Sequence, residues 1–324
     1  MRLFKLISKS FPLLQQFRYQ QCLPCPQPRH LICFKQWTAN MVLEVISSAI
    51  NLKCKHRNTH YTRLNTLADT KVTILQEVNE PILHMAVSKA STLLGAYDVN
   101  IVDNFVWEED YYGSVFSFMT DIIFVSTSKH MCVQRFADRS FVPVLCMKSR
   151  THATIQALAT VMAIIEEYGK MNCVNVSYLG PPHPVLNSYL LLCPMLGANI
   201  KYKCCCQECP VSPLLKKASE DLSVKTSTQL VECKSKEEVL NGACVVIAGP
   251  TSTKKEKIKE FQVSMCDIMK SACCNWIFFH TCPRGAEVDD QLFFGCQSRT
   301  FNAFENMQYI AAALMANAVK GFRF

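Results

Sequence analysis

The chain of 324 residues is long enough for two domains of ordinary size, and its 49% hydrophobic and 19% charged residues exclude an intrinsically disordered protein. No apolar run is long enough to cross a bilayer, so we expect no membrane partner. Six of the 34 basic residues precede the first acidic residue, Glu44, and the remaining 28 face 26 acidic residues, a near balance that gives no reason to expect nucleic acid as a partner.

Residues 1–40 are predicted to form a mitochondrial transit peptide. At helical spacing, four apolar residues share one face and three basic residues lie opposite, namely Leu3, Phe4, Ile7 and Phe11 against Arg2, Lys5 and Lys9. An amphipathic start that contains arginine and no acid is typical of such peptides. We therefore expect location in the mitochondrial matrix, cleavage within residues 18–42 and little order before residue 41. A disordered basic tail is the alternative.

Nineteen cysteines are many for a chain that is large and lacks a secretory signal, so a disulfide framework is not expected. Two pairs have Cys-x-x-Cys spacing, Cys22 with Cys25 and Cys206 with Cys209. Neither is followed by a second pair at zinc-ribbon spacing, so we expect no metal and no cofactor. The remaining thiols are expected to act as small buried hydrophobes or reduced surface groups.

The first half of the chain alternates strands and helices. The expected elements are strands at Val72–Val78, Asn100–Asp103, Ile122–Ser126 and Val142–Cys146, and a helix at Ile82–Leu94. This alternation is typical of parallel α/β units. Thr154–Tyr168 has apolar residues at helical spacing and would form a long helix that joins two domains.

The second half repeats the pattern up to a closing helix. Its expected elements are strands at Asn175–Leu179, Asn199–Tyr202, Cys244–Ala248 and Trp276–Phe279, and helices at Val185–Leu196, Lys216–Leu222, Lys236–Asn241 and Asn302–Val319. The loop Gly180–Pro184 follows a strand at its carboxyl end, where α/β proteins bind ligands. The predicted fold class is α/β, with two doubly wound parallel-sheet domains joined by the interdomain helix.

The segment after the last strand carries the most specific pattern. It contains His280, Cys282, Pro283 and Arg284, then Glu287 and Val288, and finally Glu305 and Asn306 at the start of the closing helix. This pattern resembles the C-terminal signature of the carbamoyltransferases, above all ornithine carbamoyltransferase, which reads His-Cys-Leu-Pro-Arg, Glu-Val and Ala-Glu-Asn-Arg. The order of elements from Val72 to Val319 also resembles that family.

The resemblance implies a domain organisation and a reaction. It implies a carbamoyl-phosphate-type domain at 41–168, an ornithine-type domain at 169–301 and a C-terminal helix at 302–324 that returns to the first domain. Members of the family are trimers with active sites between subunits, and their reaction uses neither a metal nor a covalent intermediate. The reaction depends on several cations that hold a phosphate while a carbonyl is polarised toward an amine.

The arginines that hold phosphate in the resembling family are missing here. The family's Ser-Thr-Arg-Thr-Arg at a helix start corresponds to Asn79–His84, where Glu80 adds a negative charge. No arginine occurs between Arg63 and Arg135. Two further family arginines correspond to Ser126 and Met307, so four arginines are absent in all.

Other positions of the family's site have changed as well. The His of His-Pro-x-Gln corresponds to Ala153, and a helix start turns the neighbouring His152 about 100° away. The family's Asp-Gly-Asn-Asn loop is replaced by Pro181–Pro184, and the Asp before its Ser-Met-Gly corresponds to Gly249. The family's Cys is Thr281, while Cys282 occupies the neighbouring Leu position.

The resemblance therefore implies a divergent carbamoyltransferase-like chain with a degenerate site. The vestigial catalytic residues would be His280, Cys282 and Arg284, and the vestigial substrate-binding residues Gln156, Glu305 and Asn306. Structural roles are the alternative: a satisfied histidine at a strand end for His280, and an ion pair with Glu287 or Asp289 for Arg284.

Three functions remain open. The first is a catalytically inactive matrix protein that acts as a homotrimer or in a hetero-oligomer with an active relative. The second is a carbamoyltransferase with an altered substrate, whose substitute anion ligands would be Arg135, Arg139, Lys148 or Arg150. The third is an active enzyme that makes citrulline from ornithine and carbamoyl phosphate.

Overall fold

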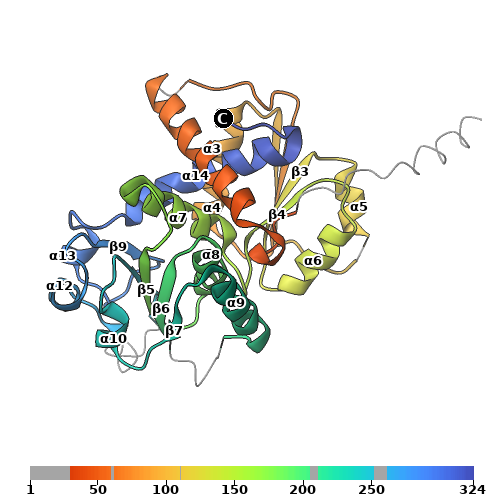
Figure 1. The fold of residues 1–324 in the computed structure, drawn as a ribbon. Helices are drawn as coiled ribbons and strands as arrows, with labels where there is room; N and C mark the ends of the chain where they lie inside the picture. Colours follow the sequence, from red (N-terminus) through yellow and green to blue (C-terminus); the bar gives the residue numbers. More distant parts are fainter. Residues whose placement is uncertain (1–29, 60–61, 110, 205–210, 252–260) are drawn as a thin grey trace, which may run out of the picture.

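The computed structural model describes residues 30–59, 62–109, 111–204, 211–251 and 261–324 (Figure 1). The predicted transit peptide up to residue 29 lies outside the described residues, as do both Cys-x-x-Cys pairs. Within the described residues, no helix combines the length and the apolar character that crossing a membrane requires.

The first domain is built on a parallel sheet of four strands in the order β2-β1-β3-β4. The strands are β1 (Lys71–Gln76), β2 (Asp98–Asp103), β3 (Ile122–Ser126) and β4 (Val144–Lys148). The helices before and between them are η2 (Phe34–Gln36, a 3-10 turn), α3 (Ala39–Asn58), α4 (Pro81–Leu94), α5 (Tyr112–Ser117) and α6 (His130–Asp138). The strands β1 and β3 are buried on both faces, which explains their continuous apolar runs in the sequence.

The second domain contains a parallel sheet of five strands in the order β7-β6-β5-β8-β9. The strands are β5 (Asn175–Leu179), β6 (Asn199–Lys203), β7 (Leu230–Glu232), β8 (Val245–Ala248) and β9 (Ile277–His280). Its helices are α8 (Pro184–Met195), α9 (Pro213–Thr226), α10 (Lys236–Leu240), α12 (Met265–Ser271) and α13 (Asp290–Phe293). Both sheets are parallel and carry helices on their faces, so the predicted α/β fold class with two parallel-sheet domains is confirmed.

Two long helices lie between the sheets. The helix α7 (Thr154–Tyr168) runs from the end of β4 to the start of β5, and α14 (Thr300–Lys320) packs beside it (Figure 1). The same α14 also contacts α3 and α4 of the first domain. A single large hydrophobic cluster includes residues of α3, α4, α7, α8 and α14, so the core is continuous between the two domains.

The expectation of little order before residue 41 is wrong for residues 30–40. Leu31 forms a parallel bridge with Leu145 of β4, and its side chain is fully buried. Phe34 is also fully buried, and Trp37 packs in the same cluster. Thr38 then caps α3 by accepting a hydrogen bond from the Met41 N–H at 3.3 Å. This segment is therefore part of the first domain.

Several element boundaries differ from the expected ones for local reasons. The fourth strand begins at Val144 and not at Val142, because Pro143 has no N–H to donate to the ladder. The first strand ends at Gln76 and not at Val78, and the Glu77 carboxylate that follows it accepts hydrogen bonds from the Thr127 and Ser128 hydroxyls. The helix expected at Lys216–Leu222 is longer, since Pro213 occupies its first turn, where proline is favoured.

Candidate functional site

The positions that resemble the carbamoyltransferase site gather where the two domains face each other. They lie at the carboxyl ends of β1, β3 and β4 in the first domain, at the end of β9 in the second, in the first turn of α7 and in the second turn of α14. The carboxyl ends of parallel strands are where open α/β sheets bind ligands. The fold therefore presents this edge as the candidate site.

The start of α4 corresponds to the helix start that holds phosphate in the resembling family. Here it offers few free hydrogen-bond donors and an acidic side chain, so it is poorly suited to bind an anion. Glu80 is the N-cap residue, and its side chain makes no capping hydrogen bond. Pro81 occupies the first turn and has no N–H, so one of the donors that helix starts offer to anions is absent. The Glu80 N–H already donates to Gln76 Oε1 at 3.3 Å.

A pocket of about 420 Å³ lies beside this helix start. Its lining includes the carboxylates of Glu77 and Asp103 together with His84. Burial alone would raise the pKa of Glu77, but hydrogen bonds from Ser128, Thr127 and Trp107 hold that pKa below its ordinary value. Glu77 is therefore a stable anion at neutral pH, and the pocket would repel a phosphate.

Lys148, a lysine near this helix start, is already paired. Lys148, at the end of β4, places its Nζ 2.6 Å from Glu80 Oε1. Lys148 is one of the four residues that would replace the missing arginines as anion ligands if the chain used an altered substrate. Arg135, another of them, lines a separate small pocket beside Glu108 and Glu109. Neither the Arg135 pocket nor the pocket beside α4 is lined by two of the four cations.

The loop before α8 contributes a histidine to the space between the domains. Burial, followed by the charges of Lys148 and His280, lowers the pKa of His183 to about 3. The neutral ring is needed here, because Nδ1 accepts a hydrogen bond from the Val185 N–H at 3.3 Å and so caps α8. The sequence reasoning missed this role, although a histidine directly before Pro184 at a helix start was a signal for it.

At the start of α7, Ala153 and His152 are both buried. The His152 ring lies near His130 of α6, with ring centroids 5.4 Å apart, and its Nδ1 is 3.4 Å from Ser188 Oγ on α8. Ser126, in place of the family's arginine, donates its hydroxyl to the Val78 carbonyl at 2.8 Å. The Ser126 hydroxyl is therefore bonded to the backbone between β1 and α4, and it offers no cation there.

His280 is engaged at both ring nitrogens. Its Nδ1 accepts a hydrogen bond from the Cys282 N–H at 2.9 Å, so Nε2 carries the proton that it donates to Glu287 Oε1, also at 2.9 Å. The side chains of His280 and Glu287 are both fully buried. Burial is the largest effect on His280 and lowers its pKa, although Glu287 opposes that effect. The pair closes the turn that follows β9.

Glu287 completes this turn. Burial would raise its pKa, but the Gly285 N–H at 2.7 Å and the Thr251 hydroxyl at 2.6 Å both donate to the carboxylate. Together with His280, these hydrogen bonds hold the pKa of Glu287 below its usual range. The carboxylate of Glu287, the first residue of the Glu-Val pair, is therefore occupied by partners within the second domain.

Arg284 pairs with Asp290, in contrast to the expected partners Glu287 and Asp289. Its Nη2 lies 2.5 Å from Asp290 Oδ1. Glu287 is occupied as described above, and Asp289 caps α13 by accepting from the Leu292 N–H at 2.8 Å. The guanidinium also lies over the rings of Phe293 and Phe294, at 4.8 and 5.5 Å from their centroids. These contacts hold Arg284 against α13.

Cys282 and Gln156 also make contacts within the fold. The Cys282 thiol packs against the hydrophobic cluster of the second domain, and burial raises its pKa to about 11. Gln156 donates from Nε2 to the Thr281 carbonyl at 2.9 Å. Gln156, His280 and Thr281 line a cavity closed by Met307 that is barely large enough for one water molecule.

Glu305 and Asn306 contact α3 and α7. Asn306 is fully buried, accepts from Lys53 Nζ at 2.6 Å and donates to Glu166 Oε2 at 2.8 Å. Lys53 also lies 2.8 Å from Glu166 Oε1, and Glu305 accepts two hydrogen bonds from Arg57.

The sequence reasoning missed Lys53, although a lysine directly after Leu52 on the apolar face of α3 was the available signal.

Within the described residues, one group of three side chains has the chemistry and proximity of metal ligands, Cys33, His130 and His152. The group lies beside the start of α7, and it includes none of the vestigial positions predicted from the sequence.

Comparisons with known proteins find similar sequences. Residues 173–318 match a family model described as the Asp/Orn binding domain of aspartate/ornithine carbamoyltransferase. The mitochondrial ornithine transcarbamylase of Gallus gallus is 23% identical over 320 residues, covering 92% of this chain and 88% of the relative. The mitochondrial ornithine carbamoyltransferase of Aquarana catesbeiana is 24% identical over 327 residues, covering 96% and 92%.

Solved structures show the same fold. The ornithine carbamoyltransferase of Pyrococcus furiosus superposes with a TM-score of 0.85 at 20% identity, covering 93% of this chain and all of the other. A mitochondrial ornithine carbamoyltransferase of Coccidioides immitis superposes with a TM-score of 0.83 at 21% identity, covering 90% and 98%.

Proposed function

Since the chain belongs to the aspartate/ornithine carbamoyltransferase family, we propose that it is a member that has lost the ornithine carbamoyltransferase reaction and acts through assembly. Its partner would be further copies of itself or an active relative, in the manner of a trimer. The matrix is its proposed location, in keeping with the basic, acid-free start of the chain and the mitochondrial relatives.

The observation that carries this proposal is the chemistry at the start of α4. A phosphate placed there would meet Glu80 and the pocket carboxylates in place of two guanidinium groups. Each lost charge-assisted contact costs roughly 1.5–3 kcal/mol. Four such losses sum to about 6–12 kcal/mol if they are additive, whereas a ten-thousandfold slower reaction corresponds to about 5.4 kcal/mol.

The vestigial positions support the same proposal. His280, Arg284 and Asn306 use their polar atoms on partners inside the fold, which leaves them poorly placed to contact a substrate. We propose that they persist because the turn after β9 and the packing of α14 depend on them. Selection for the fold alone would retain them.

The experiment is a calorimetric titration of the full chain with carbamoyl phosphate, combined with an assay for citrulline. We expect no heat of binding and no product above the no-enzyme control. Citrulline formed by the unmodified chain, and abolished by Arg284→Ala, would overturn the proposal. A binding heat without citrulline would favour the altered-substrate alternative.

A repaired chain makes the test sharper. Glu80→Arg with Ile82→Arg restores two arginines at the family's spacing, and both side chains reach solvent. Combined with Ser126→Arg and Met307→Arg, this change should restore phosphate binding before any turnover. The charge-matched control keeps Ser126→Arg and Met307→Arg and places the other two arginines on the exposed face of α9, as Glu220→Arg with Val224→Arg. It should not restore phosphate binding.

Assembly is tested separately by sedimentation of the chain alone and after co-expression with an active ornithine carbamoyltransferase. We expect a trimer mass in at least one of the two preparations. A monomer in both would contradict the proposal of function through assembly, whatever the outcome of the binding assay.

A further inference from the structure

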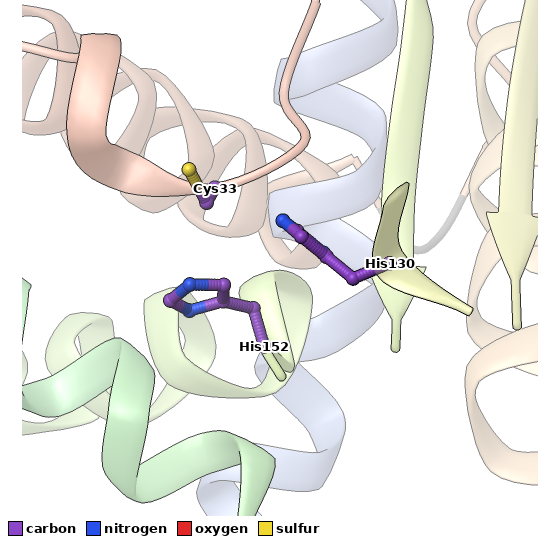
Figure 2. Close-up of side chains that lie close together, drawn as sticks. All are labelled: Cys33, His130 and His152. Atoms are coloured by element: carbon purple, nitrogen blue, oxygen red, sulfur yellow. The ribbon is translucent and has the colours of Figure 1, made fainter. Parts of the chain in front are cut away.

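Three potential ligand side chains converge beside the start of α7. Cys33 comes from the segment before η2, His130 is the first residue of α6, and His152 precedes α7 (Figure 2). One ligand atom from each lies within 4.8 Å of the other two. Residues from three separate parts of the chain therefore meet at one point, and Figure 2 shows both rings beside Cys33, whose sulfur points away from them.

Neighbouring hydroxyls orient both rings. His130 Nδ1 lies 3.1 Å from Ser149 Oγ, and His152 Nδ1 lies 3.4 Å from Ser188 Oγ. Histidines that bind metals commonly use the second ring nitrogen in this way, because the hydrogen bond fixes the ring and its tautomer. With Nδ1 engaged in both residues, Nε2 is the nitrogen left for an ion.

The protonation states suit a cation. Burial lowers the pKa of His130, and burial with the nearby His130 lowers the pKa of His152 to about 3, so both rings are neutral at physiological pH. Burial raises the pKa of the Cys33 thiol, although Lys35 opposes that effect. A coordinated divalent ion deprotonates a thiol outright, so this raised pKa does not prevent binding.

We propose that Cys33, His130 and His152 bind a zinc-type divalent transition-metal ion. The donor set of one thiolate and two imidazoles suits zinc and its cobalt substitute, and does not suit magnesium or calcium. Bonds of about 2.0–2.3 Å place tetrahedral ligand atoms roughly 3.3–3.8 Å apart, so a separation at the 4.8 Å limit would contract by about 1.0–1.5 Å on binding. We expect the half-buried Cys33 side chain to supply most of this movement by rotating, because Ser149 and Ser188 hold the two rings.

Three protein ligands leave a fourth position for water, because Cys33 and His130 are only half-buried. The ion would connect the first described segment of the chain to α6 and to the beginning of the interdomain helix. The site does not depend on the proposed loss of carbamoyl transfer, since none of its residues corresponds to the phosphate or ornithine positions.

The test is titration of the reduced, chelator-treated full chain with Co²⁺, followed by Zn²⁺. We expect one Co²⁺ per chain with the intense visible absorption of a four-coordinate ion and a thiolate charge-transfer band, both removed by Zn²⁺. Cys33→Ser should abolish the charge-transfer band and weaken binding by about a hundredfold. The matched control, Cys266→Ser on the exposed side of α12, should change neither.

Folding of each variant is checked by thermal unfolding without metal. Zn²⁺ should raise the melting temperature of the parent and of Cys266→Ser but not that of Cys33→Ser or His152→Gln. If one of these two variants does not fold, the other decides the result together with Cys33→Ala. A thiolate band that persists in Cys33→Ser, or an absence of bound Co²⁺ in the parent, would overturn the site.

Discussion

Thr281 stands where the resembling family has a cysteine, and its hydroxyl is buried without a hydrogen bond to the described residues. We predict that Thr281→Cys restores no citrulline formation, because phosphate binding fails before a carbonyl can be addressed. The loss of an unsatisfied hydroxyl should leave stability unchanged or raise it by about 1 kcal/mol. Thr281→Val serves as the control and should show the same stability change in urea unfolding. Product from Thr281→Cys alone would show that the α4 start still binds phosphate.

His183 gives the chain a predictable response to acid. Its folded pKa of about 3 lies below the ordinary value of 6.5, so the unfolded state binds more protons between these pH values. The stability that depends on the neutral ring is therefore complete above pH 6.5 and is lost as the pH falls toward 3. Lys148 and His280 face the ring, and both disfavour its charged form.

We predict that His183→Asn, which keeps an N-cap acceptor but cannot titrate, reduces this loss. From pH 7 to pH 5 the parent should lose up to about 2 kcal/mol more than the variant. Urea unfolding midpoints at the two pH values measure the difference. Equal losses in both proteins would mean that the ring is protonated in the folded state at pH 5.

At the scale of elements, α14 is attached to its neighbours through a buried polar group. Asn306→Ala removes one partner each from Lys53 and Glu166, and we predict a loss of about 2 kcal/mol in the free energy of unfolding. Asn302→Ala, the same change at an exposed position of the same helix, should stay within about 0.5 kcal/mol. A vestigial substrate ligand without a structural role would show no difference between the two.

The helices and strands whose ends the sequence predicted correctly are those with buried residues along most of their length. The buried strands β3 and β5 and the helix α7 begin and end at the predicted residues, since their apolar patterns are long and end at clear breaks. The helix α3 was not predicted, although Val42, Val45, Ile46 and Ala49 have helical spacing, because its first residues were assigned to the transit peptide. The helix α6 was missed because only three of its nine residues are buried.

The sequence was enough to identify the residues of the candidate site, but it did not predict the contacts that those residues make. Sequence order identified Glu80 as an unsuitable phosphate ligand, yet the pairing of Glu80 with Lys148 depends on how β4 and α4 are placed in space. The same holds for Cys33, His130 and His152, whose separations along the chain give no metal-binding spacing. Contacts between residues distant in the chain are set by the tertiary fold.

For the whole molecule, the position of residues 30–37 limits where a transit peptide can be removed. Leu31 pairs with β4, and Leu31 and Phe34 are fully buried. Loss of one large buried side chain costs roughly 2–5 kcal/mol, and a typical domain is stable by only about 5–15 kcal/mol. A chain that begins after residue 40 would lack both side chains and the strand pairing.

We therefore predict that deletion of residues 1–29 leaves the melting temperature unchanged, whereas deletion of residues 1–40 unfolds the protein or lowers its melting temperature sharply. Phe34→Ala in the longer chain separates burial from chain length and should lower stability by about 3–5 kcal/mol. N-terminal sequencing of protein from isolated mitochondria should then place cleavage at or before residue 29. A folded matrix form that begins after Phe34 would contradict this prediction, because it would show that the first domain does not need the segment that pairs with β4.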